Sequence, residues 1–152
     1  MDSLEERTRL SGPGIRTFPN IALRWRLSEK EQARLLRASS ENEFRHWVEA
    51  AQALQSVTLD ADVLMRLSAV LGLFGDLQQI IATVDEEHRW LRGNNNAVPF
   101  LGGAPIEVLL NGTLENLLEV RRYLLALGQG YHAPNEADRD FRPYTDDDIR
   151  WQ

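Results

Sequence analysis

The residue types that most often carry out chemistry are few in this chain, and their spacing brings none of them together. The three histidines, His46, His88 and His132, are far apart in the sequence and form no metal-ligand motif. The adjacent carboxylates Glu86 and Glu87 are expected on a solvated helical face, and no candidate nucleophile has a neighbouring base. The chain contains no cysteine, which excludes disulfides, thiolate metal sites and cysteine nucleophiles. We therefore expect neither catalysis nor a bound cofactor or metal.

Length and composition are those of a small soluble protein. The 152 residues are 43% hydrophobic, which is enough to bury a core in one domain or in two small helical ones. The first residues are charged, and no stretch approaches the roughly 20 apolar residues that cross a bilayer. A net charge of −6 argues against nonspecific coating of nucleic acid. The prediction is a soluble, cytoplasmic protein.

The positioning elements are predicted to be helices, because no stretch shows the alternation of a strand. Residues 1–17 lack periodicity and are predicted to be a flexible arm, followed by a helix over 20–26 after Pro19. A longer helix, capped by Thr58 or Asp60, is so apolar that we expect contacts on several of its sides. Its main stripe consists of Val63, Leu67, Val70, Phe74, Leu77 and Ile81.

Between these elements, two short helices form a helix-turn-helix candidate. Ser28 and Glu31 have the spacing of a capping box, which predicts a helix over 29–37. The serine pair at 39–40 offers a second N-cap, which predicts a helix over 41–54. A tight turn joins the two.

The C-terminal half reads as three further helices. The first covers 85–92 and is stopped by the Gly-Asn-Asn-Asn run that follows it. The second opens at Pro105 and ends at the Asn-Gly pair at 111–112. Thr113 then caps a helix over 114–127. The predicted fold class is all-α.

The most specific pattern of the sequence lies between residues 89 and 130. Its motifs are Trp90-Leu91, Asn94 to Asn96, Phe100 to Gly103, Pro105, Gly112 and Val120-Arg121-Arg122-Tyr123-Leu124. In both the order and the spacing of these motifs, the segment resembles the C-terminal toxin-binding domain of the MbcA/ParS/Xre antitoxin family. Upstream, residues 27–47 resemble the Xre-like helix-turn-helix that commonly precedes this domain.

This resemblance implies a function and a division of the chain. Family members neutralise toxins, often RES-domain enzymes that destroy NAD⁺, by occluding the active site, and the complex frequently represses its own promoter. The implied parts are a helix-turn-helix region over 18–82, a toxin-binding domain over 83–130 and an acidic tail over 131–152. The implied partners are a toxin, further antitoxin copies in a homodimer or larger hetero-oligomer, and operator DNA. The alternative is a helix-turn-helix transcriptional regulator without a toxin.

Toxin contacts are expected on the last helix and on the tail. Apolar residues cover an arc of about 220° of the helix over 114–127, which is more than one small core needs. Part of this face therefore either meets a partner or is sandwiched inside its own domain. The residues assigned to toxin binding are Arg121, Arg122, Tyr123 and Leu127 of this helix and Phe141, Tyr144 and Trp151 of the tail.

Arg121 falls in the middle of the apolar arc, where an unpaired charge would cost several kcal/mol. It is expected either to pair internally with Glu107 or Glu119, or to contact a partner. Arg122 lies on the polar edge and is the better candidate for a partner contact. A structural role is expected for Trp90, Phe100, Gly102, Gly103, Pro105 and Gly112.

Candidate DNA contacts lie on the second helix of the helix-turn-helix. They are Ser40, Asn42, Arg45 and His46, which could face a major groove. The carboxylates of Glu41 and Glu43 share the same turn, where phosphates would repel them, and Arg37 occupies the turn position usual for glycine. The same helix pair could therefore serve only as a packing unit.

Overall fold

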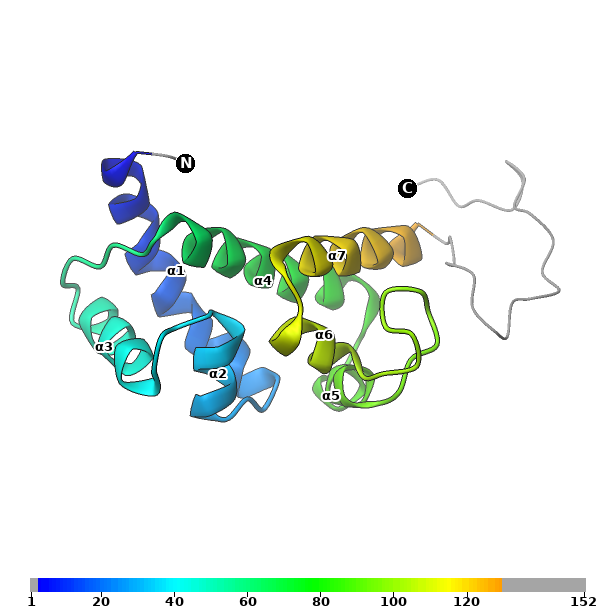
Figure 1. Cartoon of the computed structure of the whole chain (residues 1–152). Helices are drawn as coiled ribbons and strands as arrows, with labels where there is room; N and C mark the ends of the chain where they lie inside the picture. The colour runs from blue at the N-terminus through cyan, green and yellow to red at the C-terminus, as the bar shows by residue number, and fades with distance from the viewer. Residues whose placement is uncertain (1–2, 130–152) are drawn as a thin grey trace, which may run out of the picture. The chain divides into compact units, whose positions relative to one another are not determined.

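The structure is a computed structural model that describes residues 3–129, and these residues contain helices and loops but no strand (Figure 1). The predicted all-α fold class is therefore confirmed. The helices are α1 (Leu4–Arg24), α2 (Glu29–Leu35), α3 (Glu41–Gln52), α4 (Ala61–Ile80), α5 (Val84–Arg92), α6 (Pro105–Asn111) and α7 (Leu114–Gly128).

The chain divides into two compact units, residues 1–72 and residues 73–152. The limit between them falls inside α4, whereas the sequence suggested a limit at 82/83 that kept this helix in one part. Both units build their cores from helical faces.

The prediction of a flexible arm over 1–17 was wrong, because the chain is helical from Leu4 onward. The Ser3 hydroxyl accepts a hydrogen bond from the Glu6 N–H, which caps a helix that continues through both Pro13 and Pro19 to Arg24. The expected start after Pro19 was therefore wrong. The Ser-Gly-Pro-Gly stretch of α1 suggested a break in any helix there. The helix nevertheless forms and buries one apolar face, which consists of Ile15, Phe18, Ile21 and Ala22.

Hydrogen bonds tie α1 to the segment that precedes α4. The buried Ser11 hydroxyl donates to the Arg7 carbonyl at 2.6 Å and accepts from the Leu59 N–H at 3.0 Å. Arg7 Nη1 also donates to the Leu59 carbonyl at 3.2 Å. The two bonds to Leu59 join residues about fifty positions apart, which explains why local periodicity did not reveal the helix.

The two short helices α2 and α3 have the predicted caps. Ser28 and Glu31 form the capping box, and the Ser40 hydroxyl caps α3 by accepting from the Glu43 N–H. Both helices end two residues earlier than predicted. They end early because Arg37 and Leu54 adopt left-handed backbone, with φ of 61° and 59°.

The core of the first unit is aromatic and aliphatic. Trp25 is fully buried, and Phe18 and Phe44 pack edge to face with ring centroids 5.9 Å apart. Gly14 allows α1 to approach α4 closely, since a Cβ built there would lie 2.7 Å from Leu67 Cδ2. The remaining fully buried large side chains of this unit include Leu35, Leu36 and Leu59.

In the second unit the helices begin and end close to the predicted positions. As predicted, Pro105 is the first residue of α6 and Thr113 caps α7; the structure adds Thr83 as the cap of α5 and Asn116 as the partner of Thr113 in a capping box. The buried side chains that join these helices include Leu77, Leu91, Ile106, Leu109, Leu117, Val120 and Leu124.

One helix, α4, is long and apolar enough to cross a membrane by length and composition alone. It is the single such helix within residues 3–129, its mean hydropathy is only 1.2, and it places Leu67, Val70 and Leu73 in buried positions. The core helix of a soluble protein passes the same test, so α4 is consistent with a soluble protein.

Candidate partner-binding site

An aromatic cluster organises the second unit around Phe100. Phe100 packs edge to face on Trp90, with centroids 5.6 Å apart, and on Tyr123, with centroids 5.5 Å apart. Trp90 belongs to α5, Phe100 to the loop before α6, and Tyr123 to α7. The cluster therefore fixes the loop against two helices. Tyr123, which we assigned to toxin contact, is half-buried and has this internal packing role as well.

The loop over residues 93–104 is closed by backbone hydrogen bonds. The Asn95 N–H donates to the Gly103 carbonyl at 3.0 Å, and the Gly102 N–H donates back to the Asn95 carbonyl at 2.8 Å. The Asn95 side chain accepts from the Ala97 N–H at 2.9 Å. Gly102 has φ of 89°, which a glycine adopts at little cost, and Leu101 before it has φ of 50°. The Gly-Gly pair therefore serves a tight turn.

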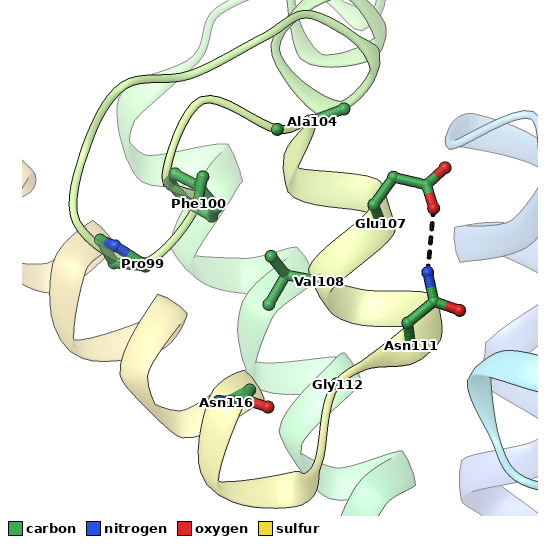
Figure 2. A pocket seen from close by; sticks show the side chains of 9 residues that line it. Pro99, Phe100, Ala104, Glu107, Val108, Asn111, Gly112 and Asn116 are labelled. Carbon is green, nitrogen blue, oxygen red and sulfur yellow. Dashed lines mark hydrogen bonds between the residues drawn. The ribbon is translucent and has the colours of Figure 1, made fainter.

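A pocket of about 320 Å³ lies beside this loop (Figure 2). Its single charged lining residue is Glu107, whose carboxylate accepts a 2.9 Å hydrogen bond from the Asn111 amide. Its lining residues are Pro99, Phe100, Gly103, Ala104, Glu107, Val108, Asn111, Gly112 and Asn116.

Gly112 is required where α6 turns into α7. A Cβ at this position would lie 2.4 Å from the Val108 carbonyl oxygen and 2.9 Å from Asn116 Cβ. No side chain fits, so the glycine keeps the junction tight. Asn116 in turn accepts from the Thr113 N–H at 2.9 Å.

Arg121 forms an internal ion pair, but its partner is Asp76 of α4 and not Glu107 or Glu119. Arg121 Nε and Nη2 donate to the two Asp76 carboxylate oxygens at 2.8 and 3.3 Å. The hydrogen bond that Arg121 donates to Asp76 raises the pKa of Arg121, against the opposing effect of burial. The sequence predicted the need for a carboxylate but gave no sign of the helix pairing that supplies it.

The other assigned residues of α7 differ in their exposure. Arg122 is exposed and donates to Glu115 of the same helix at 3.0 Å. Leu127 is half-buried, and Leu125 is 52% exposed. The buried positions of α7 are Leu117, Val120 and Leu124, and within residues 3–129 the rest of its apolar arc is half-buried, except for the exposed Leu125. The assigned tail residues, Phe141, Tyr144 and Trp151, lie outside the described residues.

The candidate DNA contacts of α3 are engaged in local bonds. Ser40 is the N-cap, and Asn42 accepts from Arg45 at 3.2 Å. Arg45 also pairs with Glu29 of α2, and this hydrogen bond raises the pKa of Arg45. His46 is exposed and borders a small pocket beside Trp47.

Arg66 is an internal residue that the sequence analysis missed. Its side chain is 3% exposed on α4, and its Nε donates to the Leu35 carbonyl at the end of α2. Burial lowers the pKa of Arg66 to about 10, with a further contribution from the charge of Arg37. Only the apolar surroundings of this arginine in the sequence could have indicated its burial.

Fold and site together define a small all-helical protein in which residues 3–129 hold no cluster of metal-ligating side chains. The chain is 31% identical over 110 residues to the uncharacterized protein y4oB of Sinorhizobium fredii, a match that covers 72% of this chain and 80% of that protein. The chain therefore belongs to the same family as y4oB. No family model matches the chain, and no solved structure matches it either.

Proposed function

We propose that this protein is the cytoplasmic antitoxin of a type II toxin–antitoxin system. It neutralises a RES-domain toxin that degrades NAD⁺ by binding the toxin and blocking its active site. One observation in the second unit carries the proposal: the residues that resemble the toxin-binding domain build a loop closed by hydrogen bonds. That loop leaves apolar side chains exposed beside a pocket, as a binding surface requires.

Steric blockade needs a rigid contact surface and no reactive group. The aromatic cluster around Phe100 and the ion pair between Arg121 and Asp76 supply rigidity within the second unit. Arg122 and Leu127 then remain the α7 residues proposed to contact the toxin. The chain's net charge of −6 is complementary to a cleft that holds the phosphates of NAD⁺.

Co-expression with the RES-domain protein of the same operon tests this function. The full chain is expected to restore growth and NAD⁺ levels, and to co-purify with the toxin as one complex. A toxin that still arrests growth, with no complex after affinity purification, would reject the proposal.

The tail is proposed to lie across the toxin's active-site cleft through Phe141, Tyr144 and Trp151. Removing residues 131–152 is expected to weaken inhibition strongly while α7 still supports binding. The measurement is toxin activity against a titration of the truncated chain. Full inhibition at the same ratio as the complete chain would restrict the contact to residues 1–130.

A second candidate function is operator binding by α2 and α3, favoured by their capped helices and short connection. Arg45 is held by Glu29, and the carboxylates of Glu41 and Glu43 are close in sequence, so we expect weak DNA binding by the protein alone. A mobility shift of the operator by the toxin complex, lost with Arg45→Ala, would support autorepression. Tight, salt-sensitive binding without any toxin would favour the regulator alternative.

A further inference from the structure

Leu101 is the most exposed large apolar side chain within residues 3–129, and its backbone conformation is unusual. Its side chain is 85% exposed, and its backbone is left-handed with φ of 50°. A leucine in this conformation is strained by about 1–2 kcal/mol relative to a right-handed one. Strain of this kind persists only where the surrounding structure imposes it; at Arg37 and Leu54 it terminates a helix, whereas Leu101 lies inside a loop.

The surrounding loop imposes this conformation. The Leu101 N–H donates to the Ala97 carbonyl at 3.0 Å, and Gly102 and Gly103 are bonded to Asn95 as described above. Ala97 and Phe100 are both buried, so they anchor the loop from inside. Leu101 is therefore presented outward on a fixed backbone, and a partner would lose little entropy in ordering it.

The neighbourhood of Leu101 combines a second apolar group with one negative charge. Val98 is 55% exposed in the same loop. Residues on both sides of Leu101 line the pocket that contains Glu107 (Figure 2), and the carboxylate is bonded to the neutral Asn111 amide. Between residues 73 and 129, seven carboxylates stand against four arginines, so this charge lies in an acidic unit.

We propose that the loop over residues 95–103 is the anchor of the toxin interface. Leu101 enters an apolar pocket of the toxin, and the toxin places a lysine or arginine beside Glu107. This inference rests on the proposed function. It adds a site on the loop to the α7 and tail contacts, and it assigns the chemistry of the partner surface.

The test is the affinity of the full chain for the purified RES-domain toxin of its operon, measured by calorimetry. Leu101→Asp is expected to raise the Kd at least about 30-fold, as for an interface hot spot. Val84→Asp changes an exposed valine of the same unit to the same charge and is expected to leave the Kd within about 3-fold. Aspartate adopts left-handed backbone more readily than leucine, so the variant keeps the fold, and its Tm checks this.

Glu107→Gln tests the charge. It is expected to slow association and to weaken the dependence of the association rate on salt, because a steering charge is removed. An association rate that depends on salt as in the wild type would overturn the assignment of a cationic partner group.

The outcomes separate the two claims. Toxin binding by the wild type with an unchanged Kd for Leu101→Asp rejects the anchor and keeps the antitoxin function. Absence of wild-type binding rejects both. A homodimer that Leu101→Asp dissociates, measured by light scattering, would assign the loop to a second copy of this chain and overturn the assignment to the toxin.

Discussion

Two arginines show how far a single residue can be interpreted from sequence. Arg121 was expected to need a carboxylate because it lies in an apolar arc, and it has one, but Asp76 is 45 residues away on α4. The pairing depends on how two helices align, and apolar periodicity does not determine that alignment. Arg66 lies in an equally apolar stretch, yet its partner is a backbone carbonyl at a helix end, which no side-chain pattern reveals.

The Arg121–Asp76 pair is predicted to stabilise the second unit more than the surface pair Arg122–Glu115. Asp76 is only 11% exposed, whereas Glu115 is 68% exposed. Asp76→Asn should lower the free energy of unfolding by about 1–2 kcal/mol, and Glu115→Gln by less than about 0.5 kcal/mol. Urea denaturation measures both, and equal effects would contradict the difference in burial.

Arg66 is predicted to stabilise the folded state through the hydrogen bond that it donates to the Leu35 carbonyl. Arg66→Met keeps the volume but leaves the Leu35 carbonyl without this donor, which should lower the free energy of unfolding by about 1–3 kcal/mol. Burial holds the folded pKa of Arg66 at about 10, below its usual value, so loss of this proton makes the wild type more stable only as pH rises above about 10.

Between pH 6 and pH 9, at least about one pH unit below the folded pKa of about 10, both the folded and the unfolded wild type keep nearly all of the Arg66 proton. The difference between wild type and Arg66→Met should therefore be constant from pH 6 to pH 9. Denaturation curves across that range provide the check, and a difference that changes steadily with pH would show that Arg66 titrates there.

At the scale of elements, the side-chain-capped helix starts and the ends of α5 and α6 could be predicted, whereas the ends of α2 and α3 could not. Side-chain caps such as Ser28, Ser40 and Thr113 are local and were recognised from spacing. The ends of α2 and α3 depend on arginine and leucine in left-handed backbone, where the sequence offers no glycine. Helix α1 was missed because its stability comes from tertiary contacts and not from local propensity.

Two glycines inside helices are predicted to respond in opposite directions to alanine. A Cβ at Gly75 meets nothing within 4 Å, so Gly75→Ala should raise the free energy of unfolding by about 0.5–1 kcal/mol. A Cβ at Gly14 would lie 2.7 Å from the buried Leu67 side chain, so Gly14→Ala should lower it by about 1–3 kcal/mol. Thermal and urea unfolding distinguish the two, and stabilisation by both would contradict the close packing of α1 on α4.

The left-handed leucines give a prediction that links stability to binding. Leu54→Gly and Leu101→Gly should each raise the free energy of unfolding by about 0.5–1 kcal/mol, because both side chains are exposed and both backbones are strained. Only Leu101→Gly should weaken toxin binding. Calorimetry with both variants provides the comparison, and equal affinities would remove the reason proposed for the strain at Leu101.

At the scale of the whole molecule, the all-α class could be predicted because helical periodicity and caps recur along the chain. The division into two units could not be predicted, since its limit falls inside α4, which is one uninterrupted helix without a linker in its sequence. The candidate site was found only in part. Its motif residues were recognised, but the exposure of Leu101 and the pocket at Glu107 depend on the loop closing on itself.

The most direct measurement of the central claim is a titration of the purified RES-domain toxin with the full chain, with NAD⁺ hydrolysis as the readout. If the chain blocks the active site, activity falls to background once the chain reaches a fixed stoichiometric ratio, and NAD⁺ at high concentration slows the onset of inhibition. Full NAD⁺ hydrolysis in the presence of excess chain would contradict it.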